Sequence, residues 1–448
     1  MVNRNEVDLN MVQSSFEELE EYLRQAKLTN LAPCLSLGLM YRGKTVYSLS
    51  RGWSHFEQGK LVTDTTRFRL ASVTKVLTAL CLCRLAEKSV LSLDTVVQNI
   101  LPWCQPKEAN GRLMTVRDLL SHGAGLPMDA AFPYWTTAVY PQREDLIKTI
   151  PFQRQVYAPG TRFKYSNLGF AIVGLLVEQI TGEDFSCVLD KEIIHPLGMK
   201  HTSLEPDEFA IGETAIGYRR VSEGKPKAPV PFIQEFAMAP CGNAVSTVED
   251  MQLLLTELCS GQRLGLEKST LYEMMRIHHF INPWTVGYGL GLYLRNHSEG
   301  TLVSHGGELA GHKAQFMLIP ERQVGVIVLS NNETAPVFSI AEKGLTSCLE
   351  HANQEECCRP IPEWNDDWNL YLGDYADTLD KWEIARHGNT LVLLDGEDNV
   401  VTNLTPLSRH LFVMDGGDYH GEQLEFIFDS HTLTKVKYGE DFFYPLHK

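Results

Sequence analysis

The sequence lacks the features of several protein classes. None of its apolar runs approaches the roughly 18 residues that a membrane-spanning helix requires. Its beginning, MVNRNEVDLNMVQSSFEELEEYL, has no basic start followed by an apolar core and a small-residue cleavage site, so it is not a signal peptide as it stands. We therefore expect a cytoplasmic protein without a membrane span.

Basic charge and paired cysteines are also scarce. Lys and Arg number 40 against 56 Asp and Glu, which gives a net charge of -16, and no Lys/Arg-rich block offsets this locally. Such a chain repels the phosphates of nucleic acid. The ten cysteines form no C-x-x-C pair and lie mostly in apolar, helix-like stretches. We expect reduced thiols, no metal site and no nucleic-acid partner.

Most of the chain reads as one α+β domain, residues 1–355. Two strand-like runs, Cys34–Tyr41 and Lys44–Ser50, are joined by Arg42-Gly43, which predicts a hairpin. Helical patterns dominate from about residue 70 to 275. Strand patterns return at TLVSHGG, KAQFMLIP and VGVIVLSN, before a helix-like run VFSIAEKGLTSCLEH. Strands at both ends with helices between them predict one antiparallel sheet completed by distant segments.

The end of the chain has a different pattern. The segment NQEECCRPIPEWNDDWN is polar, contains two prolines and has no periodicity, so we predict a linker at residues 356–368. Beyond it, KWEIARHG, TLVLLDGE, RHLFVMDGG, EQLEFIFD and TLTKVKYG are short strand-like runs separated by turn signals. They predict a small all-β barrel or sandwich over residues 369–448.

The stretch RLASVTKVLTALCLC contains a serine and a lysine three positions apart, at the start of an apolar run. A helix that is apolar all round belongs in the core, and Ser72 and Lys75 share one face of its first turn. Burial disfavours an ammonium group, so we expect a lowered pKa for Lys75. A neutral amine beside a serine hydroxyl can take its proton. The pair therefore predicts a Ser72 nucleophile with Lys75 as its base.

The Ser-x-x-Lys motif alone is weak evidence for a nucleophile, because it occurs twice in the chain. The second copy, Ser222–Lys225, lies in the Gly/Pro-rich segment VSEGKPKAP with no apolar helix after it, and we interpret it as chance. The alternative for Ser72 and Lys75 is a helix-capping serine with a lysine that extends to solvent.

Two further patterns favour the chemical interpretation. KYSNLGF holds the only Tyr-x-Asn of the chain, Tyr165 and Asn167, before an apolar run. VSHGGELAGH holds the only His-x-Gly, His305 and Gly307, at the end of a strand-like run. Their alternatives are a loop tyrosine with a capping asparagine, and a histidine that only satisfies a backbone carbonyl. His122 in SHGAGLP is interpreted as a loop-ordering residue.

In this order the three patterns resemble those of penicillin-binding proteins and serine β-lactamases. Longer stretches extend the resemblance over roughly residues 15 to 350 and are similar to the class C β-lactamase-like serine hydrolases, which include esterases and D-aminopeptidases. These stretches are LVTDTTRFRLASVTK, TVRDLLSHGAGLP, YAPGTRFKYSNLGFAIVGLLVEQITG, IHPLGMKHTSL, NAVSTVEDM and VGYGLGLYL. The last 80 or so residues resemble the lipocalin-like domain of some members. The resemblance implies a β-lactamase-like antiparallel sheet flanked by helices.

The resemblance also implies roles for the motif residues. Ser72 would be acylated and Lys75 would act as its base. Tyr165 would pass a proton to or from the leaving group and the deacylating water. Asn167 would bind a substrate carbonyl or amide.

The third motif would complete the site. The backbone N–H groups of Ser72 and Glu308 would form the oxyanion hole. Gly307 would let the substrate approach the strand edge, because it has no Cβ. His305, a further catalytic residue, stands where β-lactamases usually have lysine, as in the D-aminopeptidase and esterase branches. This difference implies poor hydrolysis of β-lactams.

Together these observations predict a serine hydrolase that forms an acyl-enzyme with an ester or a D-amino-acid-containing peptide or amide. It would need no cofactor, and its partner would be a small-molecule or peptide acyl substrate. A penicillin-binding-protein-type thioesterase or peptide cyclase and a true β-lactamase are alternatives within the same chemistry. A catalytically silent binding protein on the same fold is the alternative outside it. The sequence leaves the oligomeric state open.

Overall fold

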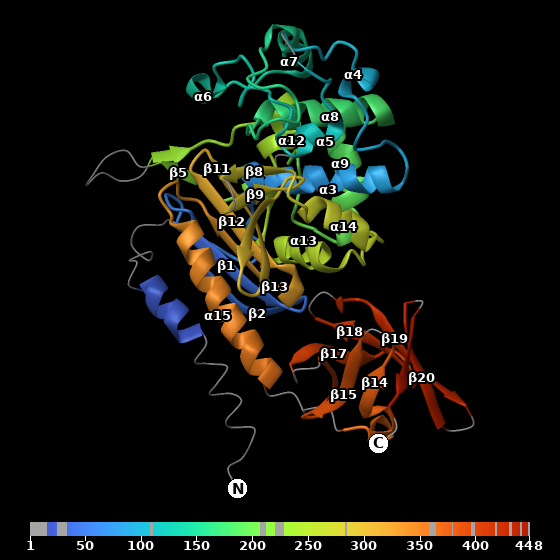
Figure 1. Ribbon diagram of the computed structural model, residues 1–448. Coiled ribbons are helices and arrows are strands. Elements are labelled where there is room, and N and C mark those ends of the chain that lie inside the picture. Colours follow the sequence, from blue (N-terminus) through green and yellow to red (C-terminus); the bar gives the residue numbers. More distant parts are fainter. Residues whose placement is uncertain are drawn as a thin grey trace. The chain divides into compact units, whose positions relative to one another are not determined.

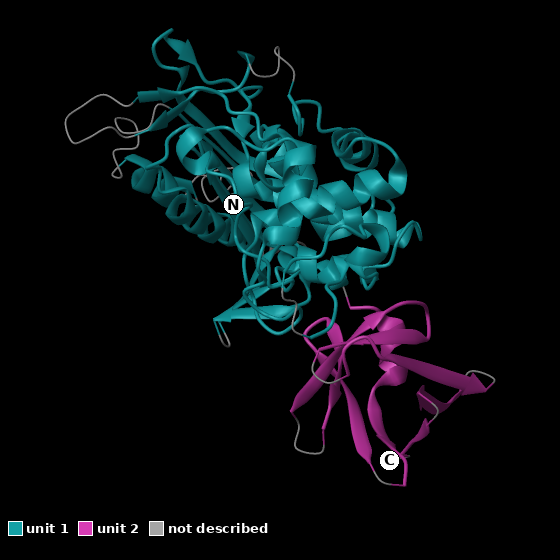
Figure 2. Ribbon diagram, turned by 90° about the horizontal axis from the view of Figure 1, so that it is seen from above, with its two compact units in different colours: residues 1–356 teal, residues 357–448 magenta. Residues whose placement is uncertain are grey.

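The chain divides into two compact units, residues 1–356 and 357–448 (Figure 2). The start of the chain and the second Ser-x-x-Lys copy, Ser222–Lys225, lie outside the described residues. The structure is a computed structural model that describes residues 16–24, 34–107, 111–206, 212–219, 228–282, 285–357, 364–378, 380–395, 399–416, 419–429, 432–439 and 441–446.

A nine-stranded antiparallel sheet forms the centre of the first unit, in the order β3-β2-β1-β13-β12-β11-β10-β9-β8. The predicted hairpin is confirmed, and its turn residues Arg42 and Gly43 have φ values of 50° and 71°, as a tight hairpin turn requires. The hairpin pairs with β13, so distant segments complete one sheet, as predicted. The strands are β1 (Cys34–Tyr41), β2 (Lys44–His55), β3 (Lys60–Leu61), β8 (His279–Asn282), β9 (Val286–Tyr288), β10 (Tyr293–His297), β11 (Gly300–Leu309), β12 (His312–Ile319) and β13 (Val324–Ser330).

Both faces of this sheet are covered (Figure 1). Alternate residues of β1 and β13 point to opposite faces, so each strand contributes to two apolar clusters. One cluster joins the sheet to α15 (Val337–Cys357) and to the helix at residues 16–24, and the other joins it to the helical region. Helix α15 runs to Cys357 and thus beyond the start of the predicted linker at residue 356.

The helical region lies between the hairpin and β8 in sequence. Its central helix α3 (Thr74–Glu87) is buried on nearly all sides, as its apolar run predicts. The other helices are η1 (Ala71–Val73), α4 (Val97–Ile100), α5 (Val116–Leu120), α6 (Tyr134–Thr137), α7 (Arg143–Thr149), η2 (Ile150–Phe152), α8 (Asn167–Thr181), α9 (Phe185–Leu189), η3 (Asp190–Ile194), α10 (His195–Leu197), η4 (Phe236–Met238), α12 (Ala239–Gly242), α13 (Val248–Ser260) and α14 (Lys268–Met275). Two small sheets pair β4 (Phe68–Arg69) with β7 (Val245–Ser246) and β5 (Gly217–Arg219) with β6 (Ala228–Val230).

The second unit is a closed eight-stranded antiparallel barrel, preceded by η6 (Asp366–Tyr371), so the predicted all-β class is confirmed. Aromatic rings fill much of its interior, and Trp382 stacks on Phe443 with ring centroids 3.8 Å apart. A barrel of this strand number has an interior that side chains can fill. The strands are β14 (Gly373–Ala376), β15 (Lys381–His387), β16 (Thr390–Leu394), β17 (Val400–Pro406), β18 (Leu411–Asp415), β19 (Gln423–Asp429), β20 (Thr432–Tyr438) and β21 (Asp441–Pro445).

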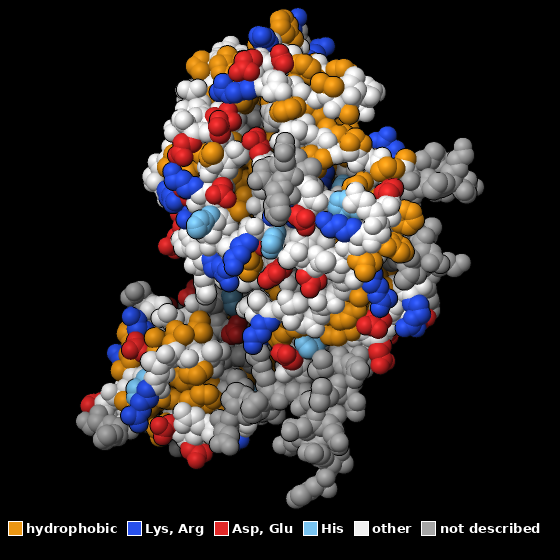
Figure 3. Space-filling view, turned by 180° about the vertical axis from the view of Figure 1, so that it is seen from behind, with side chains coloured by type: hydrophobic (Ala, Val, Ile, Leu, Met, Phe, Trp, Pro, Cys, Tyr) orange, Lys and Arg blue, Asp and Glu red, His pale blue; other side chains and the backbone are white. Residues whose placement is uncertain are grey.

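The surface carries charges of both signs. On the face shown in Figure 3, Lys and Arg side chains are interspersed with Asp and Glu. Exposed ion pairs such as Arg143–Glu178 and Lys191–Glu183 contribute to this mixture. Within the described part of the chain, no helix has both the length and the apolar character needed to cross a membrane.

Candidate active site

Ser72 lies in the short η1 helix that leads directly into α3. The residue before it, Ala71, has a φ of 47°, a left-handed conformation that costs energy for any residue with a Cβ. The turn places Ser72 at the rim of a pocket, with its side chain partly exposed. A strained turn therefore presents this serine hydroxyl to the pocket.

Lys75, one turn further on, is fully buried (0% exposed). Its Nζ donates three hydrogen bonds: to Ser72 Oγ at 3.2 Å, to Asn167 Oδ1 at 2.8 Å and to the Cys241 carbonyl at 2.8 Å. An ammonium group has three donors, and Tyr165 is a further hydrogen-bonding neighbour of Nζ that can share one of them. The structure thus brings together the Ser72, Lys75 and Asn167 side chains that the sequence motifs singled out.

The protonation of Lys75 differs from the sequence prediction. Burial lowers the pKa of Lys75, as expected, but the nearby Tyr165, Cys241 and Glu235 raise it, and the net direction of the pKa is upward. Three oxygen acceptors around Nζ also favour the charged form. The predicted lowering was therefore wrong: Lys75 is an ammonium in the resting site.

Asn167 is the first residue of α8 and links the lysine to a loop carboxylate. Its Nδ2 donates to Asp129 Oδ1 at 2.8 Å, while its Oδ1 accepts from Lys75. Ser166 caps the helix by accepting from the backbone N–H of Gly169 at 2.9 Å, which fixes where α8 begins. The amide of Asn167 is thereby held in one orientation beside Ser72.

Tyr165 lies beside the lysine, with Lys75 Nζ 4.9 Å from its ring centroid. The ring of His122 packs against it at a centroid distance of 4.2 Å. His122 Nδ1 accepts from the backbone N–H of Ser166 at 3.1 Å, the loop-ordering contact expected for this histidine. Burial lowers the pKa of His122 well below its usual value, and the charge of Lys75 adds to this effect. His122 is therefore neutral and supports the Tyr165 loop.

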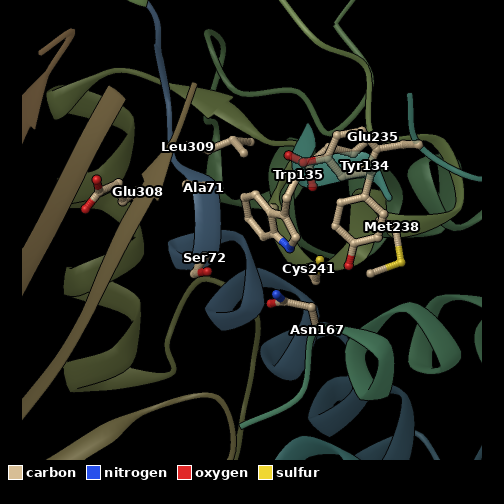
Figure 4. Close-up of a pocket in the computed structure, with 12 residues that line it drawn as sticks. Ala71, Ser72, Tyr134, Trp135, Asn167, Glu235, Met238, Cys241, Glu308 and Leu309 are labelled. Atoms are coloured by element: carbon tan, nitrogen blue, oxygen red, sulfur yellow. The ribbon is translucent and has the colours of Figure 1, made fainter. Parts of the chain in front are cut away.

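Strand β11 lies against the Ser72 turn at Gly307. A Cβ on Gly307 would come within 2.2 Å of the Leu70 carbonyl oxygen and 3.0 Å of the Ser72 backbone nitrogen. A side chain at this position would therefore force the strand away from the serine. The next residue, Glu308, has a side chain that is 63% exposed and paired with Lys313 at 3.4 Å. It points away from Ser72 in Figure 4.

His305 lies on the same strand but is buried, at 1% exposed. Its Nδ1 donates to the Gly306 carbonyl at 2.8 Å, which leaves Nε2 to accept from the Tyr288 hydroxyl at 3.2 Å. Burial and, to a smaller extent, the charge of Lys75 lower the pKa of His305 to about 3. The ring is neutral, and its two nitrogens bond to these partners and not to Ser72 or Lys75.

The motifs did not identify two acidic groups near Ser72: Glu235, which lines the pocket (Figure 4), and Asp129, which is hydrogen-bonded to Asn167. Asp129 orients Asn167 and also accepts from Tyr134 and Trp135. Glu235 lines the pocket itself and pairs with Arg69 at 2.8 Å. The lining residues are Ala71, Ser72, Tyr134, Trp135, Tyr140, Asn167, Glu235, Met238, Cys241, Gly242, Glu308 and Leu309.

The sequence carried a signal for both of these acids. Glu235 is an isolated carboxylate in the otherwise largely apolar run PFIQEFAMAP, where a charge is costly unless it is paired. Asp129 is likewise the only charged residue in the apolar stretch GLPMDAAFPYW. Among the described residues, no three or more His, Cys, Asp or Glu side chains are grouped so that they could hold a metal ion.

Comparison with known proteins gives both sequence and fold relatives. The family model described as Beta-lactamase matches residues 19–345. Protein flp of Staphylococcus aureus (strain COL) is 23% identical over 348 residues, which cover 75% of this chain and 67% of that protein. Esterase EstB of Burkholderia gladioli is 31% identical over 191 residues, which cover 38% of this chain and 47% of that protein.

Solved structures share the fold. The octameric penicillin-binding protein homologue from Pyrococcus abyssi has a TM-score of 0.66 at 23% identity, with 95% of this chain and 98% of that chain covered. EstCE1, described as a hydrolase with promiscuous acyltransferase activity, has a TM-score of 0.65 at 21% identity, with 76% of this chain and 99% of that chain covered.

Proposed function

This chain belongs to the beta-lactamase family, and we propose that it is a serine hydrolase in which Ser72 attacks an ester or an amide of a D-amino-acid-containing peptide and becomes acylated. The observation that carries the proposal is the contact between Ser72 Oγ and the fully buried Lys75 Nζ. A serine beside a buried, hydrogen-bonded lysine is a common form of activated nucleophile. The esterase relative and the hydrolase of similar fold support the reaction class.

Because Lys75 is charged in the resting site, it must release one proton as it accepts the proton of Ser72. We propose a relay: the Ser72 proton passes to Lys75 Nζ, a Lys75 proton passes to Tyr165, and the Tyr165 hydroxyl proton passes to the leaving group. Lys75 ends as an ammonium and Tyr165 as a phenol, so the protons balance. The same path in reverse serves the deacylating water.

The oxyanion that forms at the substrate carbonyl is stabilised, in this proposal, by the backbone N–H groups of Ser72 and Glu308. The contact of Gly307 with the Ser72 turn supports this role, because it brings the two backbone segments together. Donors fixed in this way favour the charge that develops in the transition state.

His305 influences which substrates fit. A neutral, buried histidine offers no cation to a substrate carboxylate, whereas the lysine usual at this position in β-lactamases does. We therefore expect esters and aminoacyl amides to react faster than β-lactams. In this proposal His305 acts through its hydrogen bond with Tyr288. The Tyr288 ring lies 4.7 Å from the ring of His122, and His122 in turn packs against Tyr165.

Pre-steady-state kinetics test the proposed function. With p-nitrophenyl esters, D- and L-aminoacyl p-nitroanilides and a cephalosporin, we expect a burst of product equal to the enzyme concentration for the best ester or anilide, and slow turnover of the cephalosporin. Rapid cephalosporin hydrolysis would contradict the substrate assignment, and the absence of any covalent intermediate would contradict the mechanism.

A further inference from the structure

A second cavity of the first unit lies apart from the pocket beside Ser72. Its volume is about 460 Å³, within the range of about 300 to 1,000 Å³ that is usual for small-molecule sites. The two hollows have no lining residue in common. The end of β2, strand β4, the β5–β6 pair and the turn between β11 and β12 contribute its walls. This cavity is large enough for a ligand of its own.

Close backbone contacts hold one wall of the cavity in place. Strand β5 lies against the β11–β12 turn (Figure 1), where a Cβ on Gly217 would come within 2.1 Å of the Ala310 carbonyl oxygen. A Cβ on Gly311 would come within 2.4 Å of the Tyr218 nitrogen. Much of the remaining lining is apolar and includes residues 229–232, Pro-Val-Pro-Phe. The cavity therefore has a fixed wall and an apolar surface.

Arg69 supplies a hydrogen-bond donor in the lining of this cavity. Its side chain is 1% exposed. Nη1 donates to the Ile233 carbonyl at 2.6 Å, and Nη2 donates to Glu235 Oε1 at 2.8 Å and to Asn243 Oδ1 at 3.0 Å. Nε is buried and has no hydrogen-bond partner among the described residues. Buried donors are normally paired, so the Nε–H group is available to a ligand.

His312 supplies a hydrogen-bond acceptor in the same lining. It is 3% exposed, and burial and the charge of Arg69 lower its pKa to about 3, so the ring is neutral. A hydrogen bond with the Ala215 backbone opposes this lowering, as donation to a carbonyl does. Nδ1 is buried and has no partner within the described part of the chain. A neutral imidazole has one donor nitrogen, which Ala215 uses, so Nδ1 is an acceptor.

These two groups restrict the chemistry of a ligand. Glu235 already balances the charge of Arg69, and the lone pair of His312 Nδ1 repels a carboxylate. An ammonium group would face the Arg69 cation. A hydroxyl group can both accept from an N–H and donate to an imidazole nitrogen. The pair therefore favours a neutral hydroxyl group over a charged group of either sign.

We propose that this cavity binds an uncharged compound with an apolar body and a hydroxyl group, whose oxygen accepts from Arg69 Nε and whose O–H donates to His312 Nδ1. Residues 229–232 contact the apolar body. This site goes beyond the proposed function, because it is separate from the pocket beside Ser72. The two are nevertheless connected, since Arg69 lines the cavity and its partner Glu235 lines that pocket.

Binding is tested in Ser72→Ala, so that the result does not depend on the proposed acyl-enzyme chemistry. The probes are benzyl alcohol, toluene, benzoate and benzylamine, titrated by ligand-observed NMR. Benzyl alcohol should bind saturably and at least as tightly as toluene, although toluene is the more hydrophobic of the two. Both charged compounds should bind more weakly than the alcohol. Tighter binding of toluene, benzoate or benzylamine, or no saturable binding of the alcohol, would overturn the proposal.

Two substitutions in the Ser72→Ala background locate the site. His312→Phe keeps a ring but removes the acceptor, and it should reduce the preference for benzyl alcohol over toluene by about 10-fold, the loss expected for one hydrogen bond. Val230→Trp leaves the histidine in place but fills the cavity, and it should abolish binding of both compounds. Val90→Trp places the same side chain at an exposed position elsewhere and should bind both as Ser72→Ala does.

Kinetics of the enzyme with Ser72 intact distinguish two origins of such a compound. If it is a separate effector, saturating benzyl alcohol should change kcat for p-nitrophenyl acetate, and Val230→Trp should remove this change. If it is the distal part of a substrate, the alcohol should instead raise KM for longer esters and leave the acetate unaffected. Unchanged alcohol binding in Val230→Trp, or an equal loss in Val90→Trp, would show that the cavity is not the binding site and would refute the inference.

Discussion

The two units of the chain differ most in what they bury. The first unit has Lys75, Arg69, Glu235, His122 and His305 in its interior. Among the described residues of the barrel, Thr402 is the only buried polar side chain, and aromatic rings fill the core. Burying a charge costs free energy that a purely structural domain avoids. The contrast therefore supports the assignment of the proposed chemistry to the first unit.

The largest expected effect comes from Ser72. Ser72→Ala should lower kcat on the order of a million-fold, because the covalent step loses its nucleophile. Steady-state kinetics with the best ester or anilide measure the loss, while circular dichroism should show both units still folded. The matched control is Ser222→Ala in the second Ser-x-x-Lys copy, which should keep full activity. An equal loss of activity in Ser72→Ala and Ser222→Ala would contradict the distinction between the two Ser-x-x-Lys copies.

The next effect concerns Lys75. Lys75→Arg should lower kcat/KM by about 100- to 10,000-fold, because a guanidinium does not give up a proton and does not fit the three bonds around Nζ. Lys225→Arg in the second copy is the control and should behave as the native enzyme. Near-native acylation by Lys75→Arg would show that the lysine takes no part in the relay.

Two neighbouring glycines on β11, Gly306 and Gly307, allow a test with a smaller expected effect on activity. Gly306 serves as the control for Gly307. Gly307→Ala should lower kcat by about 100- to 1,000-fold, because the new Cβ pushes the strand from the Ser72 nitrogen and opens the proposed oxyanion hole. A Cβ on Gly306 meets chiefly the end of the Gln315 side chain, 2.7 Å away, which can rotate. If Gly306→Ala is as inactive as Gly307→Ala, the contact with Ser72 is not the cause.

The smallest expected effect is on stability in acid, and its size should differ between the two units. Burial lowers the pKa of both His305 and His312 to about 3, so below the usual pKa of about 6.5 the unfolded chain binds protons that the folded unit does not. The contribution of these histidines to the free energy of unfolding is therefore fully present above about pH 6.5. It falls as the pH drops toward 3, by an amount on the order of a few kcal/mol.

Glu235 acts in the opposite sense, because burial raises its pKa to about 7, and the raised pKa values of Glu205 and Asp250 act with it. These three groups stand against six histidines of the first unit whose pKa is lowered. Pulse proteolysis at increasing urea, with fragments identified by mass, reports each unit separately. The urea midpoint of the first unit should fall more between pH 7 and pH 4.5 than that of the barrel. Equal falls would mean that the buried histidines are not what distinguishes the units.

Local patterns predicted much of this molecule from sequence. The apolar run after Lys75 predicted the buried helix α3, and Arg42-Gly43 predicted the hairpin turn with two positive φ values. Short strand signals separated by turns predicted a small all-β barrel or sandwich, and the structure is a closed barrel. In each case the information lies within a dozen or so residues, so a local pattern is sufficient.

Features that depend on distant contacts were not predicted. The acceptors that keep Lys75 charged come from Asn167 and Cys241, far along the chain, and burial alone gave the wrong direction for its pKa. The pairing of Glu235 with Arg69 likewise joins residues that only the fold brings together. The bonding of the His305 ring depends on its rotamer and on Tyr288, which no motif specifies.

The most direct test of the central claim is the mass of the protein after reaction with a fluorophosphonate, a small probe of activated serines. We expect one added probe per chain, located on the peptide that contains Ser72, and no addition to Ser72→Ala. Labelling of another serine, or equal labelling of Ser72→Ala, would contradict the assignment of Ser72 as the nucleophile.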